Sequence, residues 1–139
     1  MILTGFVWTL LQFRPQLYEK TPQLLSGLKP NFALIGEVLF GDYNLIVNDD
    51  MLHSCTNYEC YKGLFSSLND MNLFEIAHSL HRQFGADPWC IYRGKHLMTF
   101  ADNHDVTRLA SILKNKTTYP YCIWYFTWNA GHSLPVLRQ

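Results

Sequence analysis

The stretch that most constrains the fold is the apolar run over residues 33–40, Ala-Leu-Ile-Gly-Glu-Val-Leu-Phe, in which Glu37 is the one charged residue. A continuous apolar run of this length is typical of a strand buried on both faces of a parallel sheet. Residues 16–28 precede it with leucines at helical spacing, so together they predict a helix–strand unit of an α/β protein. Burying an unpaired carboxylate is costly. Glu37 therefore forms a salt bridge, lies at the strand end, or serves a function.

A second junction follows at residues 100–111, where an apolar, strand-like run stops and a helical pattern begins. Asp102, Asn103, His104 and Asp105 occupy this strand-to-helix turn, and residues at the carboxyl ends of strands face the ligand crevice of α/β proteins. Asp105 has a simpler interpretation as the N-cap of the following helix. Together with Glu37 it also makes a pair of carboxylates at two strand ends, which is the usual apparatus for cleaving glycosidic bonds.

Several segments of the sequence resemble one enzyme family. Ile-Gly-Glu-Val at 35–38 and Phe-Ala-Asp-Asn-His-Asp-Val-Thr-Arg at 100–108 resemble two short signatures of the α-amylase family of glycoside hydrolases. Residues 57–64, Asn-Tyr-Glu-Cys-Tyr-Lys-Gly-Leu, and 72–85 are similar to bacterial α-amylase-like and cyclomaltodextrinase-like members. The similarity extends over about residues 28–126.

This resemblance implies a (β/α)8 barrel that cleaves α-glucans such as maltodextrins with retention of configuration. It assigns Glu37 as general acid and base, and Asp105 as the residue that stabilises the transition state. It places His104 and Asn103 as substrate-binding residues at the sugar. It implies no cofactor for this chain, although calcium is possible in full-length members of the family.

The third signature of the family is a strand that ends in an Arg and the nucleophilic Asp, and this chain departs from it. Residues 1–13 are rich in β-formers, but Val7 stands in place of the Arg and Thr9 in place of the Asp. The first acidic residue is Glu19. A retaining glycosidase without its nucleophile cannot form the glycosyl-enzyme intermediate. We therefore expect negligible hydrolysis, and a non-catalytic remnant that binds glucans weakly is the alternative.

The length predicts an incomplete barrel. The chain has 139 residues, whereas a (β/α)8 barrel needs about 250. We expect one incomplete catalytic-barrel domain over residues 1–139, an α/β fold with about four parallel strands and alternating helices. The resemblance fades past residue 127, as in a truncated or degraded gene product or a partial gene model. An open half-barrel exposes strand edges, so self-association is expected.

Composition limits the partners. Lys plus Arg and Asp plus Glu number eleven each, so no nucleic acid or anionic membrane is predicted as a partner. The apolar residues 1–13 are too short to span a bilayer and lack the features of a signal peptide. Four irregularly spaced cysteines suit a reduced chain, and we expect a cytoplasmic protein.

The sequence contains two candidate metal sites. The acidic loop with Asp42, Asp49 and Asp50 lacks the ligand pattern of an EF-hand, so a solvated loop is preferred to a calcium site. A zinc-stabilised interaction module is a further alternative, with these four residues as ligands: Cys55, Cys60, His78 and His81. The two histidines are too close in sequence for the usual zinc finger. We therefore predict no metal site.

Three more elements follow from local patterns. Residues 72–85 predict a helix capped by Asn72 and ended by Gly85, with Glu75 returning a hydrogen bond to the cap. Residues 51–61 are predicted to hold the next strand, and residues 121–128 are predicted as the last strand. The aromatic residues of the latter form either a sugar-stacking platform or packed core.

Overall fold

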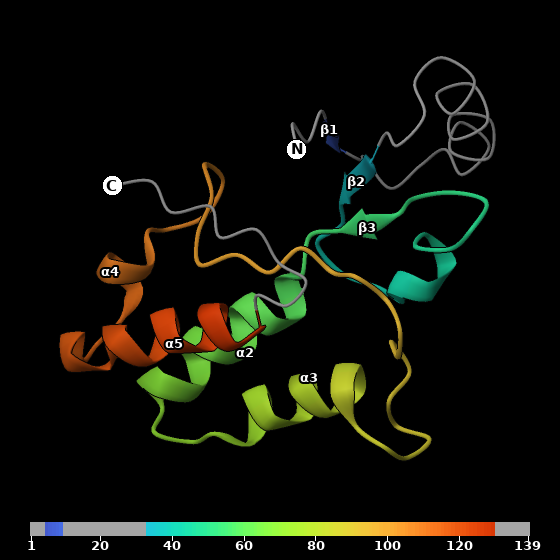
Figure 1. Ribbon diagram of the computed structural model, residues 1–139. Coiled ribbons are helices and arrows are strands. Elements are labelled where there is room, and N and C mark those ends of the chain that lie inside the picture. The colour runs from blue at the N-terminus through green and yellow to red at the C-terminus, as the bar shows by residue number, and fades with distance from the viewer. Residues whose placement is uncertain (1–4, 10–32, 130–139) are drawn as a thin grey trace.

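A computed structural model of the chain describes residues 5–9 and 33–129, and the side chains of residues 33–125. In chain order the elements are β1 (Gly5–Thr9), β2 (Ala33–Glu37), η1 (Tyr43–Leu45), β3 (Ser54–Cys55), α2 (Tyr58–Asn69), α3 (Phe74–Phe84), α4 (Leu109–Ile112), η2 (Lys116–Thr118) and α5 (Tyr119–Asn129). Parallel strands combined with helices confirm the predicted α/β class (Figure 1). The helix predicted over residues 16–28 lies outside the described residues.

The sheet is parallel, with the strand order β1-β2-β3. Its register pairs Thr9 with Glu37 at the carboxyl-terminal edge. Next to β3, the segment around Met98 runs parallel but is joined only by the bridge from Thr56 to Met98. Strand β3 is only two residues long because helix α2 begins at Tyr58, so little backbone is left for a fourth strand to pair with. The described residues form three strands and this bridge, whereas about four strands were predicted. The partial (β/α)8 barrel remains a prediction.

Helix α2 begins within residues 51–61, the stretch that was predicted to hold a strand. The Asn57 side chain accepts a hydrogen bond from the Cys60 amide at 3.2 Å and so caps the helix. The helix then packs closely against α3, since a Cβ atom added at Gly63 would lie 3.3 Å from the Ile76 Cα. Strand β3 confirms the strand that was predicted within residues 51–61, and the capping side chain of Asn57 ends the extended segment after it.

Helix α3 confirms the helix predicted over residues 72–85. The cap prediction is wrong by one residue, because the N-cap is Leu73, which makes no side-chain cap hydrogen bond. Asn72 lies just before it and accepts a hydrogen bond from the Phe74 amide at 3.0 Å, and the helix ends at Gly85. Glycine is needed there because an added Cβ would lie 2.6 Å from the carbonyl oxygen of His81. The predicted bond from Glu75 to the cap is wrong, since that carboxylate instead pairs with Lys62 and Ser66 of α2.

Helix α5 replaces the strand that was predicted over residues 121–128. Cys122 and Tyr125 are buried while Tyr121 and Trp124 are exposed, which is the spacing of a helix face. Pro120 lies in the first turn, where a proline is compatible with a helix. Trp124 is exposed and Tyr125 is buried, so these two do not share a sugar-stacking platform. The side chains of Phe126 and Trp128, the other members of that alternative, lie outside the described residues.

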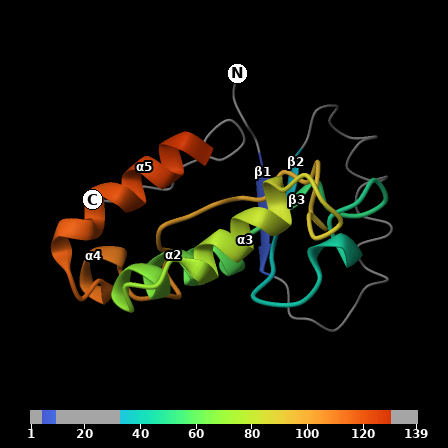
Figure 2. The ribbon, with the colours of Figure 1, turned by 90° about the horizontal axis from the view of Figure 1, so that it is seen from below.

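The helices lie together on one side of the molecule. Figures 1 and 2 show α2 and α3 side by side, with α4 and α5 toward the end that is farther from the sheet. A helical core joins these four helices through the following buried residues: Cys60, Leu64, Ile76, Ala101, Leu109, Leu113, Cys122 and Tyr125. A second core, next to the sheet, contains Val38, Tyr43, Val47, Cys55, Tyr92 and Leu97. Among the described residues, no helix combines the length and the hydropathy needed to cross a bilayer.

Candidate functional site

Glu37 lies at the carboxyl end of β2 and is only 5% exposed. The hydroxyl of Tyr58, the first residue of α2, donates a hydrogen bond to Glu37 Oε1 at 2.8 Å. Thr56 fixes the backbone just after the strand, because its Oγ1 accepts a hydrogen bond from the Val38 amide at 2.9 Å. The carboxylate therefore sits at a rigid strand end and is held by a neutral donor, not by a salt bridge within the described residues.

Tyr58 also connects Glu37 to the turn after residue 100. Asn103 Nδ2 donates a hydrogen bond to the Tyr58 hydroxyl at 2.9 Å, which completes a chain from Asn103 through Tyr58 to Glu37. Burial raises the pKa of Tyr58 to about 12, and the bond to Glu37 acts in the same direction while the bond from Asn103 opposes it. At neutral pH the phenol is protonated and remains a donor to the carboxylate.

Asp105 and His104 lie on the exposed side of the same turn. The Asn103 side chain accepts a hydrogen bond from the Asp105 amide at 2.9 Å, which shapes the turn. His104 Nε2 is 3.4 Å from Asp105 Oδ1, and the two side chains are 81% and 54% exposed. The structure thus brings Glu37 and Asn103 together through Tyr58, and it leaves Asp105 and His104 open to solvent beside them.

The capping alternative for Asp105 is wrong. Asp102 performs that role, because its Oδ2 accepts a hydrogen bond from the Leu109 amide at 2.9 Å at the start of α4. Its Oδ1 also accepts a hydrogen bond from Arg108 at 2.6 Å. The carboxylate of Asp105 is therefore not used in capping α4.

Position 9 is the neighbour of Glu37 across the sheet. The register of β1 and β2 pairs Thr9 with Glu37, and paired strands lie about 4.8 Å apart. The residue that stands in place of the family's nucleophile therefore lies at the sheet edge that carries Glu37. That edge meets the end of β3 and the turn at Asn103, because the carboxyl ends of parallel strands lie on one side.

Sequence reasoning missed the structural importance of two adjacent residues, Asn57 and Tyr58. Asn57 is fully buried, and its Nδ2 donates a hydrogen bond to Gln83 Oε1 of α3 at 3.2 Å. Gln83 in turn donates to Cys60 Sγ at 3.0 Å. This polar network fixes the start of α2 and so places Tyr58. The signal in the sequence was an Asn-Tyr pair at residues 57 and 58, within the stretch that was predicted to hold a strand.

The proposed zinc ligands do not meet. No group of three or more His, Cys, Asp or Glu side chains that could hold a metal forms among the residues that the structure describes. Cys55 and Cys60 belong to different cores, and His81 pairs with Asp87 at 2.8 Å. Burial raises the pKa of Cys55 to about 12, which disfavours the thiolate that binds metals. The zinc module is therefore wrong.

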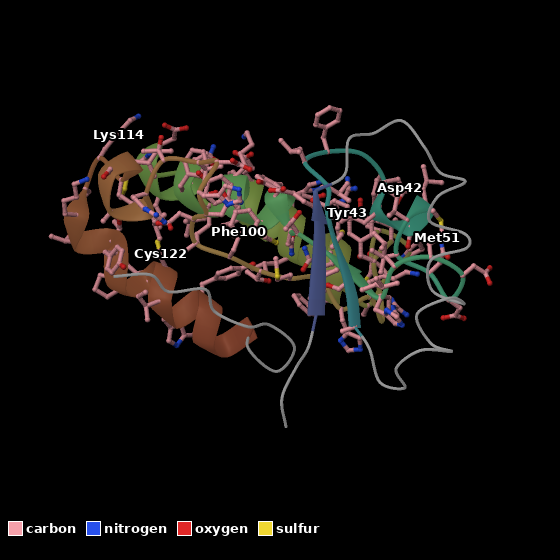
Figure 3. The ribbon with its side chains drawn as sticks, turned by 90° about the horizontal axis from the view of Figure 1, so that it is seen from above. Asp42, Tyr43, Met51, Phe100, Lys114 and Cys122 are labelled. Carbon is pink, nitrogen blue, oxygen red and sulfur yellow. The ribbon has the colours of Figure 1, made fainter. Side chains whose placement is uncertain are left out.

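The aromatic residues around Tyr58 form a wall beside the site. Tyr61 stacks on Phe100 with ring centroids 5.1 Å apart, and Tyr58 meets the same ring edge-on at 4.8 Å. Figure 3 shows Phe100 between the helices and the strands, with Tyr43 on the far side of β2. The polar chain of Asn103, Tyr58 and Glu37 is thus backed by rigid aromatic packing.

Comparison with solved structures finds a protein of similar fold. The maltogenic amylase from S. marinus matches with a TM-score of 0.59 and 18% sequence identity over 78% of this chain. The match takes in 15% of the amylase chain, so this chain corresponds to a small part of that protein. No protein-family model matches the sequence, and no curated protein matches it either. The likeness shows that this chain shares its fold with part of that amylase. This agrees with the sequence resemblance to the α-amylase family.

Proposed function

We propose that this chain is part of an α-amylase-type glycoside hydrolase domain that binds an α-glucan at the Glu37 edge of the sheet and hydrolyses it negligibly. The observation that carries the proposal is the hydrogen-bonded chain Asn103–Tyr58–Glu37. It links the two segments that resemble the catalytic signatures of the family. The fold shared with a maltogenic amylase supports the same interpretation.

The roles follow from position. Tyr58 holds Oε1 of Glu37, and among residues 33–125 Oε2 makes no hydrogen bond, so Oε2 is the atom to face a glycosidic oxygen. Asp105, exposed on the adjacent turn, would stabilise positive charge that develops on the sugar ring. His104 and Asn103 would donate hydrogen bonds to sugar hydroxyls.

Binding without turnover is the form of this function that we favour. Retaining enzymes hold their two carboxyl groups about 5–5.5 Å apart. The strand neighbour of Glu37 falls within about this distance, but that neighbour is Thr9. A threonine cannot supply the carboxylate that forms the covalent intermediate, so a bound glucan is expected to remain intact.

Calorimetric titration of the full chain with maltoheptaose tests the proposal. We expect saturable binding, weakened about tenfold in Glu37→Gln because a charged hydrogen bond to the sugar is lost. Asp70→Asn is the matched control, since Asp70 is an exposed carboxylate that pairs with Lys114, and it should bind like the parent chain.

Two results would contradict the proposal. The absence of saturable heat with maltoheptaose would remove glucan binding. Release of reducing sugar that persists through stringent purification and disappears in Glu37→Gln would show that the chain is a competent hydrolase and that Thr9 is no obstacle.

A further inference from the structure

A pocket of about 330 Å³ lies between the end of α3 and the turn that follows at residues 93–96. Arg93, Lys95 and His96 contribute basic side chains to its lining, and no Asp or Glu of the described residues lines it. Its volume is near the lower end of the range for small-molecule sites, which is about 300–1,000 Å³. The pocket therefore suits a small ligand and carries an excess of basic groups.

Arg93 is held at this pocket by backbone carbonyl groups. Its Nη2 donates hydrogen bonds to the carbonyl oxygens of Gly85 at 3.2 Å and of Asp87 at 3.3 Å. Its Nε and Nη1 donate none to the side chains and backbone of residues 33–125, and a guanidinium has five N–H donors in a planar fork. Arg93 is therefore fixed in place with donors that the carbonyl groups do not use, and its fork matches the oxygen atoms of a phosphate group.

Lys95 brings a second positive charge to the pocket. Its Nζ donates a hydrogen bond to the carbonyl oxygen of Val47 at 2.6 Å, and this neutral acceptor does not cancel the charge. The ion pairs among the described side chains include neither Lys95 nor Arg93. Asp87, the carboxylate nearest to Arg93 in the sequence, pairs instead with His81 at 2.8 Å. Both positive charges thus lack a carboxylate partner within this part of the chain.

The end of helix α3 does not cancel the charge either. The carboxyl end of a helix carries about half a negative charge, whereas Arg93 and Lys95 each carry a full positive charge. The carbonyl group of Arg82 in the last turn also accepts a hydrogen bond from the Tyr92 amide at 2.9 Å, so it does not face an incoming anion unpaired. The pocket therefore keeps a net positive charge.

We propose that this pocket binds a phosphate group, either as inorganic phosphate or as the monoester group of a small sugar phosphate. A phosphate accepts strong charge-assisted hydrogen bonds from arginine and lysine. Phe84 is 56% exposed in the lining and offers an apolar face to the organic part of a monoester. The lining contains none of the residues to which the proposed function assigns a role, so this inference does not rest on it.

Calorimetric titration of the full chain with inorganic phosphate and, separately, with glucose 6-phosphate at pH 7 tests the proposal. We expect saturable binding that is weakened about tenfold in Lys95→Gln, which removes the charge and keeps an amide donor for the Val47 carbonyl group. Lys116→Gln is the matched control and should bind like the parent chain. Lys116 also donates to backbone carbonyl groups, those of Ala110 and Ser111, and does not line the pocket.

The two ligands distinguish the source of the phosphate group. Tighter binding of glucose 6-phosphate supports a monoester ligand, and equal or tighter binding of inorganic phosphate supports the free ion. The absence of saturable heat with both ligands would overturn the proposal. Equal affinities in Lys95→Gln and Lys116→Gln would overturn it as well, because the phosphate would then bind elsewhere.

An NMR titration of the unaltered chain gives a test that does not depend on the folding of a variant. The phosphate ligand that binds should shift the backbone amide signals of Gly85 and Gly94, which line the pocket. A titration that shifts other amide signals and leaves these two unchanged would place the ligand at another site and refute the proposal.

Discussion

Replacing Tyr58 with phenylalanine removes one oxygen atom and two hydrogen bonds. The hydroxyl donates to Glu37 Oε1 at 2.8 Å and accepts from Asn103 Nδ2 at 2.9 Å. The ring remains and keeps its edge-on contact with Phe100. The change therefore isolates the polar connection between the two strand ends from the packing around it.

The expected loss follows from the burial of the two partners. Glu37 is 5% exposed, so water cannot readily replace the lost donor, and a hydrogen bond to a charged group is worth about 1.5–3 kcal/mol. Asn103 is only half-buried and regains a water partner, so it adds little. We expect the free energy of unfolding at pH 7 to fall by about 2–3 kcal/mol.

Urea denaturation followed by circular dichroism measures this loss, with Tyr61→Phe as the matched control. Tyr61 lies on the same helix, has the same 8% exposure and also packs on Phe100. Its hydroxyl makes no hydrogen bond to residues 33–125, so its removal should change the free energy of unfolding by less than about 0.5 kcal/mol.

Equal stability of the two variants would refute this reasoning. It would mean that Glu37 is not held by Tyr58, or that the carboxylate is solvated in a way that the structure does not indicate. A large loss of unfolding free energy in Tyr61→Phe alone would show that the stabilising polar contact belongs to Tyr61 and not to Tyr58.

Three further predictions concern stability and assembly. Asn57→Ala should lower the free energy of unfolding by about 2–3 kcal/mol, because it removes the cap of α2 and leaves the buried carbonyl oxygen Oε1 of Gln83 without its donor. In chemical denaturation, a loss no larger than that of Asn115→Ala, an exposed cap, would contradict it. The free energy of unfolding should fall between pH 9 and pH 12, because burial raises the pKa of Cys55 and of Tyr58 to about 12 in the folded chain. The two protonated groups contribute their full stabilisation below the pKa values of the unfolded chain, and this stabilisation is lost as the pH rises through 12. Constant denaturation midpoints from pH 8 to pH 12 would disprove this prediction. The full chain should form oligomers if an incomplete barrel exposes its strand edges, and a monodisperse monomer by light scattering would count against this.

Local sequence signals correctly predicted two elements, β2 and α3. Strand β2 was predicted from an apolar run, and α3 from a cap, a periodic pattern and a final glycine. The helical spacing of Leu73, Ile76, Ala77, Leu80 and Phe84 predicts one apolar stripe on this segment, but Leu73 and Phe84 are exposed while Ser79 and Gln83 are buried. Which polar side chains a helix buries depends on the partner helix, and no periodicity reveals that partner.

The two strand predictions that failed have different causes. Residues 121–128 are apolar on all sides, and a short apolar run does not distinguish a strand from a buried helix. Contact with the helical core decides for α5, in which Cys122 and Tyr125 face inward. The predicted strand before Phe100 is reduced to one bridge because its neighbour β3 ends after two residues.

The sequence by itself determined the α/β class, the strand that ends in Glu37, the polar turn at residues 102–105 and the absence of an acidic residue before Glu19. These follow from the order of residue types along the chain. Only the tertiary structure decided that Asp102 caps α4, that Asp105 is left open, and that Tyr58 joins Glu37 to Asn103. The physical reason is that a hydrogen bond between distant residues depends on how the parallel strand ends converge, and a linear pattern does not contain that geometry.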